Sequence, residues 1–204
     1  MLYAVLQVWG GTFYFLNKVF LSRAERAKND ETERIWRIWC WTVYLIGLPG
    51  YFLVFLLQDN FIAAGAEIGG GPAMALGFVL ALWGHRKKPA WVDVLDIFSI
   101  AVAAAAGMVY SVHLIGGITT FNQVLEFFMV AGFLAGTVLL AKKNPKGYLW
   151  FLLMNGTNAV LQSREEAYFL VVLQIVSMGL VLDAYLVQRR KARARHASIN
   201  SPVS

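Results

Sequence analysis

The chain has 204 residues, of which 58% are apolar and only 15% are charged, and its formal net charge is +6. This excess of apolar residues is typical of a membrane protein and excludes an ordinary soluble domain. The basic residues stand at the ends of apolar segments rather than along an aromatic-studded polar face, so we expect no nucleic-acid partner.

Seven apolar segments follow one another, each about as long as a helix that crosses the roughly 30 Å hydrocarbon core of a bilayer. Their continuous runs favour helices over the alternating strands of a β-barrel. The first segment starts directly at Met1 and has no basic residue before Lys18, so we interpret it as a retained helix rather than a cleaved signal. The predicted spans are 2–21, 35–57, 61–83, 94–115, 124–141, 148–162 and 168–188.

The connections between the segments predict the orientation in the membrane. Four clusters, after the first, third, fifth and seventh segments, put fifteen Lys and Arg on one face, and the other face has only Arg164. This bias predicts an integral membrane protein with its N-terminus outside and its C-terminus cytoplasmic. We expect the membrane to be a bacterial plasma (inner) membrane. A six-span alternative would scramble the alternation. The fifteen are Arg23, Arg26, Lys28, Arg34, Arg86, Lys87, Lys88, Lys142, Lys143, Lys146, Arg189, Arg190, Lys191, Arg193 and Arg195.

The second and third segments resemble the sixth and seventh. Each pair begins with tryptophan, turns at a short polar loop and ends in a basic cluster, and residues 61–68 align on residues 168–175 without a gap. We therefore predict an all-α membrane protein with seven transmembrane helices, arranged as two parallel three-helix bundles joined by a linker helix. The predicted units are the first bundle at 1–93, the linker helix at 94–119, the second bundle at 120–190, and a basic, disordered tail at 191–204.

Acidic side chains inside apolar segments are costly and are therefore functional candidates. Glu67 aligns with Gln174 in the repeat and precedes the run Gly-Gly-Gly-Pro at 69–72, which predicts a broken helix beside a ligand or proton site. The alternative is that Glu67 reaches water at the interface, or that the glycines only permit close packing. Asp183 is expected to pair with the nearby Arg189 or Arg190.

Amide and aromatic side chains complete the candidate solute site. Asn155 and Asn158 are three residues apart and share a helical face, and Gln174 on the next helix can complete the same pocket. Interhelical hydrogen bonding is the alternative role of these amides. Trp41 and Tyr44 share a face and can stack on a flat ring, whereas an interfacial belt is the alternative for the tryptophan.

The sequence offers no recognisable catalytic chemistry. His85, His113 and His196 are scattered over different parts of the chain, and neither an HExxH nor a GxSxG motif is present. We expect no metal, no cofactor and no catalytic residue, and therefore no enzyme.

A further set of residues in the last third of the chain has a familiar spacing. It consists of Trp150, Asn155, Tyr168 and the pair Leu173-Gln174. This set resembles the Leu-Tyr-x-Asp-x-x-Leu-Gln signature of the Pnu-type vitamin transporters for nicotinamide riboside and nicotinamide mononucleotide, which share the plan of SWEET sugar transporters. Leu170 stands at the aspartate position of that signature.

The resemblance implies facilitated diffusion of a vitamin-like nucleoside, which a cytoplasmic kinase would trap. It also implies that the amides of Asn155 and Gln174, with an aromatic side chain such as Trp41, hold the ribose and base. We therefore expect a transporter whose partners are a small-molecule solute and the lipid bilayer, with a homo-oligomer left open. A proton-coupled version would give Glu67 the coupling role. A membrane-embedded enzyme subunit and a receptor or sensor protein are the alternative functions.

Overall fold

A computed structural model describes residues 1–83, 89–141 and 144–200 of the chain. Within them the chain forms seven helices, and each overlaps one predicted span. The predicted cytoplasmic bases at 86–88, 142 and 143 lie outside the described residues. The helices are α1 (Leu2–Arg26), α2 (Asp30–Leu57), α3 (Phe61–Leu82), α4 (Ala90–Ile115), α5 (Phe121–Ala141), α6 (Gly147–Arg164) and α7 (Tyr168–Asn200).

Local sequence signals set several of the helix ends. The Asn29 side chain accepts a hydrogen bond of 2.7 Å from the Thr32 N–H and so caps the start of α2. Acidic residues in the first turn of α2 interact favourably with the helix dipole. α4 ends at Gly116, whose φ of 80° is a left-handed conformation that glycine adopts without steric cost. The end of α4 at Ile115 agrees with the predicted span 94–115, whereas α2 begins five residues before the predicted residue 35 because the Asn29 cap and the acidic first turn extend the helix.

Five of the helices, α2, α3, α4, α5 and α7, are long and apolar enough to cross a membrane. The predicted fold class, an all-α membrane protein, is confirmed. α1 and α6 are not among the five because polar side chains interrupt their apolar runs. Asn17 of α1 and Asn155, Asn158 and Gln162 of α6 are all buried, so these interruptions face the interior of the protein.

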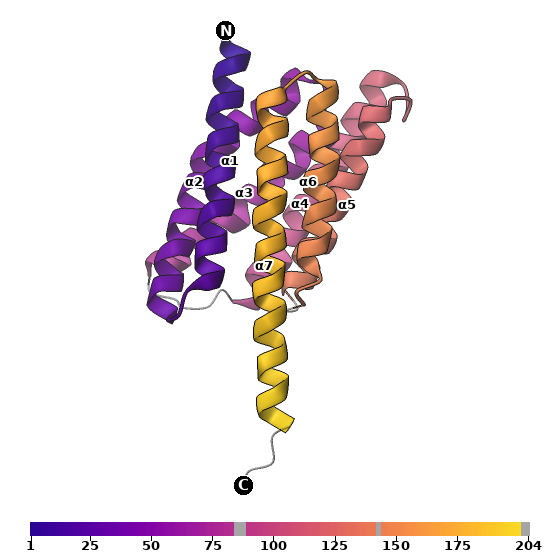
Figure 1. The fold of residues 1–204 in the computed structure, drawn as a ribbon. Helices are drawn as coiled ribbons and strands as arrows, with labels where there is room; N and C mark the ends of the chain where they lie inside the picture. The colour runs from indigo at the N-terminus through magenta and orange to yellow at the C-terminus, as the bar shows by residue number, and fades with distance from the viewer. Residues whose placement is uncertain (84–88, 142–143, 201–204) are drawn as a thin grey trace.

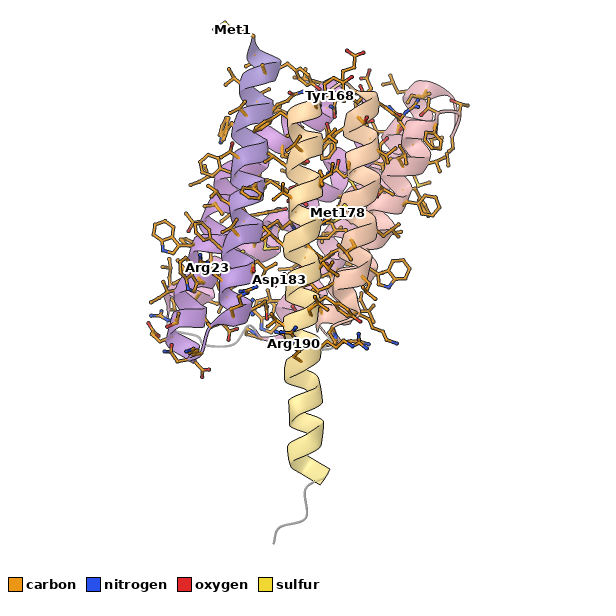
Figure 2. The ribbon with its side chains drawn as sticks, viewed as in Figure 1. Met1, Arg23, Tyr168, Met178, Asp183 and Arg190 are labelled. Atoms are coloured by element: carbon orange, nitrogen blue, oxygen red, sulfur yellow. The ribbon has the colours of Figure 1, made fainter. Side chains whose placement is uncertain are left out.

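Successive helices alternate in direction, and Figure 1 shows Met1 and the end of α7 at opposite ends of the molecule. We name these the Met1 end and, from the label in Figure 2, the Arg190 end. α1 packs between α2 and α7, α2 also packs on α3, and α6 packs between α5 and α7. α4 packs mainly on α3. The division into two parallel three-helix bundles joined by a linker helix stays a prediction.

The α2–α3 and α6–α7 hairpins repeat one another at a separation of 107 residues. Asp59 and Glu166 occupy the same place in the two turns, with φ of 57° and 55°, and are the only non-glycine residues of the described chain with positive φ. The same backbone bond closes both turns, from the Asn60 N–H to the Phe55 carbonyl (3.0 Å) and from the Ala167 N–H to the Gln162 carbonyl (2.9 Å). The gap-free alignment found in the sequence therefore extends to the backbone of both turns.

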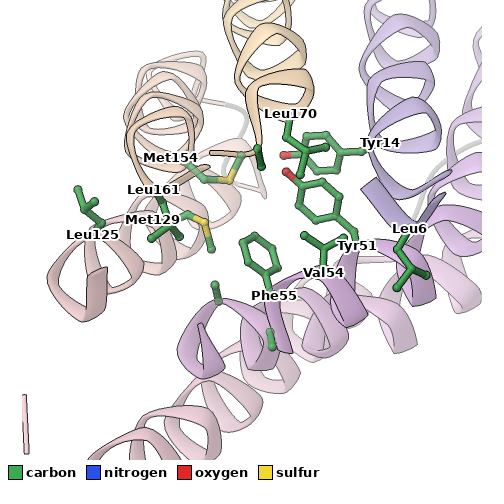
Figure 3. Close-up of a cluster of buried hydrophobic side chains, with 13 residues drawn as sticks. Leu6, Tyr14, Tyr51, Val54, Phe55, Leu125, Met129, Met154, Leu161 and Leu170 are labelled. Atoms are coloured by element: carbon green, nitrogen blue, oxygen red, sulfur yellow. The ribbon is translucent and has the colours of Figure 1, made fainter. Parts of the chain in front are cut away.

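The main apolar core gathers residues from every helix except α4. Figure 3 shows Tyr51 and Phe55 directed from α2 into this core, with Tyr14 of α1 beside Tyr51. Val54, Phe55, Leu161 and Leu170 are fully buried. Because lipid tails are as apolar as these side chains, close packing rather than hydrophobic transfer favours their association within a bilayer.

The predicted break in the third helix is wrong, because α3 is continuous through Pro72. Its glycines permit close packing instead. A Cβ at Gly69 would lie 2.7 Å from the Cα of Ile100 on α4, and a Cβ at Gly70 would lie 2.8 Å from the Tyr44 hydroxyl. Pro72 removes only one backbone hydrogen-bond donor from α3. The helices packed on α3, namely α2 and α4, hold it in place as a continuous helix.

α7 continues as a helix to Asn200, although the sequence predicted a disordered tail from residue 191. The segment 191–200 is rich in Ala, Arg and Lys, which have high helix propensity, so the helix extends past the last apolar residues. Residues 201–204 of the predicted tail lie outside the described residues.

Candidate functional site

The hydroxyl of Tyr51 joins α2, α6 and α7 inside the protein, at positions about 9 Å from the Met1-end termini of these helices. It accepts hydrogen bonds from the Asn158 side-chain amide of α6 at 3.1 Å and from the Gln174 amide of α7 at 2.7 Å. Tyr51, Asn158 and Gln174 are all buried. Two of the predicted site residues therefore lie together, and a tyrosine that the sequence analysis did not select holds them.

A second polar layer lies one turn closer to the Arg190 end. Because α6 and α7 are antiparallel, Asn155 and Ser177 reach similar depths, three residues from Asn158 and Gln174 respectively. Asn155 donates to the Phe151 carbonyl of its own helix at 2.6 Å. Asn155 Oδ1, Gln174 Oε1 and Ser177 Oγ are buried and have no hydrogen-bond partner among the described residues. An unpaired buried polar atom costs about 1–3 kcal/mol, so three on two neighbouring helices indicate a site for polar groups of a ligand.

Aromatic rings border these polar layers. The rings of Tyr14 and Tyr51 are stacked, with centroids 5.0 Å apart and planes 9° apart, and Phe55 meets Tyr51 edge-on at 5.1 Å. Figure 3 shows the two tyrosines side by side with their hydroxyls toward Leu170 of α7. Such a surface suits a flat ring, whose faces attract aromatic neighbours.

Glu67 and Tyr44, both predicted site residues, contact each other on α3 and α2. The Tyr44 hydroxyl donates to the Glu67 backbone carbonyl at 3.1 Å. Glu67 is buried and interacts electrostatically with Tyr14, Tyr51 and Lys18. Glu67 thus belongs to the same polar interior, on the side formed by α2 and α3.

Trp41 lies apart from the other predicted site residues. Its ring packs against Gly77 of α3, where a Cβ would lie 3.1 Å from the ring. Ten residues separate Trp41 from Tyr51, which corresponds to about 15 Å along a helix. The structure therefore does not bring Trp41 to the amide layer, and Tyr14 and Tyr51 occupy the position that the sequence analysis gave to the tryptophan.

A chain of amide hydrogen bonds runs from this site to the Met1 end. Gln58 donates to the Tyr3 hydroxyl at 2.8 Å and to the Gln162 side-chain carbonyl at 2.9 Å, and Gln162 donates to Asn158 at 3.4 Å. We name these four residues the amide chain. It links α1 and α2 to α6, and Gln58 and Gln162 are buried.

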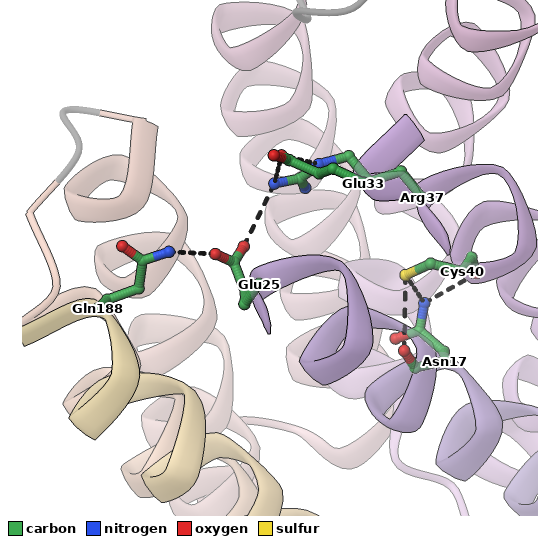
Figure 4. Close-up of polar contacts among 6 residues, drawn as sticks. All are labelled: Asn17, Glu25, Glu33, Arg37, Cys40 and Gln188. Atoms are coloured by element: carbon green, nitrogen blue, oxygen red, sulfur yellow. Dashed lines mark hydrogen bonds and ion pairs between the residues drawn. The ribbon is translucent and has the colours of Figure 1, made fainter. Parts of the chain in front are cut away.

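Charged groups link α1 to α2 and α7 at the Arg190 end. Glu25 accepts hydrogen bonds from Arg37 of α2 at 3.3 Å and from Gln188 of α7, as Figure 4 shows. Arg26 binds Asp183 through two nitrogens, at 2.5 and 3.1 Å. Figure 2 places Asp183 on α7 near this end. The predicted pairing of Asp183 with an arginine of its own helix is wrong, because α1 packs against α7 and presents a nearer guanidinium.

Four residues of the interior were missed from the sequence, namely Tyr14, Lys18, Tyr51 and Ser177. Two of them carried a usable signal. Tyr51 is 107 residues before Asn158 and so occupies its position in the repeat, and Ser177 lies three residues after Gln174 on the same face of the helix. Tyr14 and Lys18 belong to α1, whose place beside α7 only the packing establishes.

Among residues 1–83, 89–141 and 144–200, no group of three or more His, Cys, Asp or Glu is placed to hold a metal ion. The polar groups described above around Tyr51 are hydroxyls, amides, the carboxylate of Glu67 and the ammonium of Lys18. Such groups bind a polar solute by hydrogen bonds and charge.

The chain matches a known protein family. The model of a family described as nicotinamide mononucleotide transporter matches residues 33–190. The matched range begins within α2 and ends within α7, so it includes both hairpins and all predicted site residues. No curated protein and no solved structure gave a significant match.

Proposed function

Because this chain belongs to the nicotinamide mononucleotide transporter family and is a membrane transporter of a vitamin-like solute of that class, we propose that it works by facilitated diffusion through the polar interior around Tyr51. The protein lies in a bacterial inner membrane, with the Met1 end facing outward and the Arg190 end facing the cytoplasm. The protein performs no chemistry on the solute.

One observation carries this proposal, the group of buried acceptors on α6 and α7 that have no hydrogen-bond partner in the part of the chain that the structure describes. Ribose hydroxyls and a carboxamide NH2 are donors, and they match the oxygens of Asn155, Gln174 and Ser177. The stacked rings of Tyr14 and Tyr51 supply a surface for the nicotinamide ring. Tyr44, Glu67 and Asn158 complete the proposed site, whereas Trp41 is left out of it because of its distance along α2.

The distribution of charge supports the orientation. Arg23, Arg26, Arg189 and Arg190 lie toward the Arg190 end, and Figure 2 shows Arg23 and Arg190 there. The described connections at the Met1 end hold only Arg164. Basic residues are retained on the cytoplasmic side of bacterial membranes, so this end is assigned to the cytoplasm.

The contacts at the two ends suggest how access alternates. The amide chain joins α1 and α2 to α6 at the Met1 end, and the Gln188–Glu25 and Arg26–Asp183 contacts join α1 to α7 at the Arg190 end. A solute enters only when one set opens, and release on the other side requires the other set to open. The two predicted three-helix bundles rock about the layer of Tyr51. Because only one of the two sets of contacts is open at a time, transport occurs without a continuous pore.

The test is uptake by the purified full chain in liposomes, with labelled nicotinamide riboside and nicotinamide mononucleotide. We expect saturable uptake of at least one of them that a protonophore does not change. Tyr51→Phe keeps the stacked ring but removes the acceptor for two amides, and is expected to reduce uptake by roughly tenfold.

The matched control is Tyr110→Phe. Tyr110 lies on α4, its side chain is largely exposed, and its ring meets Phe61 edge-on. This variant is expected to retain wild-type uptake. Absence of saturable uptake of both solutes by the wild type would overturn the proposed function.

A further inference from the structure

A cavity of about 720 Å³ lies between α1, the start of α2 and α7, toward the Arg190 end. Its size falls within the range of about 300–1,000 Å³ that is usual for small-molecule sites. Arg23 and Lys28, which line it, are exposed, so the cavity opens to the outside of the protein. Figure 2 shows Arg23 beside α1 and Asp183 on α7, both nearer the Met1 end than Arg190. The cavity shares no lining residue with the polar interior around Tyr51 and is therefore a separate space.

The polar part of the lining carries an excess of positive charge. Arg23, Arg26 and Lys28 contribute three cations, and Asp183 contributes one carboxylate. Arg26 binds this carboxylate through two nitrogens, at 2.5 and 3.1 Å, and the Ser22 hydroxyl donates to it at 3.4 Å. Arg26 and Asp183 therefore neutralise each other, and the charges of Arg23 and Lys28 remain to attract an anion.

Arg23 and Lys28 are also available for binding. In residues 1–83, 89–141 and 144–200, neither side chain forms an ion pair with a carboxylate. The Arg23 guanidinium lies over the Trp36 ring, 6.0 Å from its centroid, a contact that leaves the N–H groups free to bind an oxyanion. Glu31 and Glu33 at the start of α2 bind arginines of their own helix and do not line the cavity.

The other part of the lining is apolar and reaches to the depth of the acyl chains. It consists mainly of Val19, the Trp36 ring and Leu180. Leu180 lies 12 residues after the start of α7, which is about 18 Å along that helix and within a hydrocarbon core about 30 Å thick. Arg23 lies 21 residues after the start of α1, about 31 Å along the helix and thus at the edge of that core. The cavity therefore extends from acyl-chain depth to headgroup depth.

We propose that this cavity binds an anionic phospholipid from the leaflet at the Arg190 end. Arg23 and Lys28 bind the phosphate of its headgroup, and Val19, Trp36 and Leu180 contact the start of an acyl chain. A molecule with a negative charge at one end and an apolar chain at the other matches both parts of the lining, whereas a soluble phosphate leaves the apolar part empty. The bound lipid is a component of the membrane and not a transported solute, so this site is additional to the proposed function.

The test measures the thermal unfolding midpoint of the purified full chain in detergent with three probes, namely phosphatidylglycerol, phosphatidylcholine and glycerol 1-phosphate. Phosphatidylglycerol is expected to raise the midpoint by about 3–6 °C at ten times its dissociation constant, because a ligand that binds the folded state stabilises it. Phosphatidylcholine carries no net charge and glycerol 1-phosphate carries no acyl chain, so each is expected to raise the midpoint by less than half as much. An equal rise with either of them would overturn the assignment to an anionic lipid.

Combining Arg23→Gln with Lys28→Gln removes two positive charges from the lining. The rise produced by phosphatidylglycerol is expected to fall to less than half of the wild-type value. The matched control combines Arg189→Gln with Arg190→Gln, which removes the same charge from the same end of the molecule. Both of these arginines are exposed on α7 and neither lines the cavity, so the control should keep the wild-type rise. An equal loss in the two double variants would indicate diffuse attraction of lipid to a basic surface and contradict a defined site.

Native mass spectrometry of the wild type provides a measurement that does not depend on folding of a variant. From an equimolar mixture of phosphatidylglycerol and phosphatidylcholine, each chain is expected to retain one molecule of phosphatidylglycerol in preference. Retention of both lipids in equal amounts would count against the proposed site.

Discussion

The α2–α3 and α6–α7 hairpins have turns of the same backbone conformation but present different side chains to the interior. In the repeat, which has a separation of 107 residues, Tyr51 is equivalent to Asn158 and Glu67 is equivalent to Gln174. The first hairpin thus contributes a hydroxyl and a carboxylate, and the second contributes two amides. Both turns nevertheless have the same backbone hydrogen bonds.

This difference explains how a repeated backbone forms an asymmetric site. The Tyr51 hydroxyl accepts bonds from both amides of the second hairpin, so the contact between the halves depends on unlike groups at equivalent positions. Two identical hairpins would place like groups opposite each other, for example two phenol rings. The turn geometry needs only a few backbone bonds, and these leave the inward-facing side chains free to differ.

The largest expected effect comes from the amide that faces both Tyr51 and the solute. Gln174→Leu removes the 2.7 Å bond to Tyr51 and the unpaired Oε1 together. We expect solute affinity to fall by about 100-fold, measured by calorimetry, because more than one buried hydrogen bond is lost. Insertion into the membrane should be unaffected. Wild-type affinity in this variant would rule out the site around Tyr51.

Glu67→Gln makes the first hairpin match the second at this position. The charge that faces a cationic ring is lost, which at a separation of about 8 Å and an effective dielectric constant of 20 is worth about 2 kcal/mol, or roughly 30-fold in affinity. Both the riboside and the mononucleotide should be affected, since both carry the pyridinium ring. If uptake in the wild type collapses with a protonophore and becomes insensitive in Glu67→Gln, this residue couples transport to protons instead.

Asn155→Leu tests the second hairpin alone, because its repeat position in the first hairpin is already Leu48. The variant removes one unpaired buried oxygen, and affinity should fall by about tenfold. Thr157→Val is the control, since among the described residues the Thr157 hydroxyl bonds only to backbone carbonyls of its own helix. Equal loss in both variants would indicate a general effect on α6 rather than a role in the site.

Gln162→Leu breaks the amide chain, and its expected effect is the smallest on binding. Gln58 loses a buried partner at 2.9 Å, which costs about 1–3 kcal/mol and should lower the thermal unfolding midpoint by a few degrees. Affinity should change by less than about threefold, because the solute lies closer to Tyr51. A large loss of affinity would instead place Gln162 in the binding site.

The sequence by itself determined the seven helices, their alternating direction and the gap-free repeat. These properties depend on runs of neighbouring residues and on spacing along one helix, so they are readable without the fold. The proximity of Asn158 and Gln174 could also be predicted from the sequence, because a short antiparallel hairpin brings positions at equal distances from its turn to similar depths.

Only the tertiary structure decided which residues of different helices meet. Packing of α1 against α7 brought Tyr14 and Lys18 to the interior, and the rotation of α2 directed Tyr51 toward the amides while Trp41 packed on Gly77. Close contact with α4 likewise kept α3 continuous through its glycines. The physical reason is that spacing in sequence fixes the face of a single helix, whereas the rotation and depth of one helix against another depend on the packing of the whole protein.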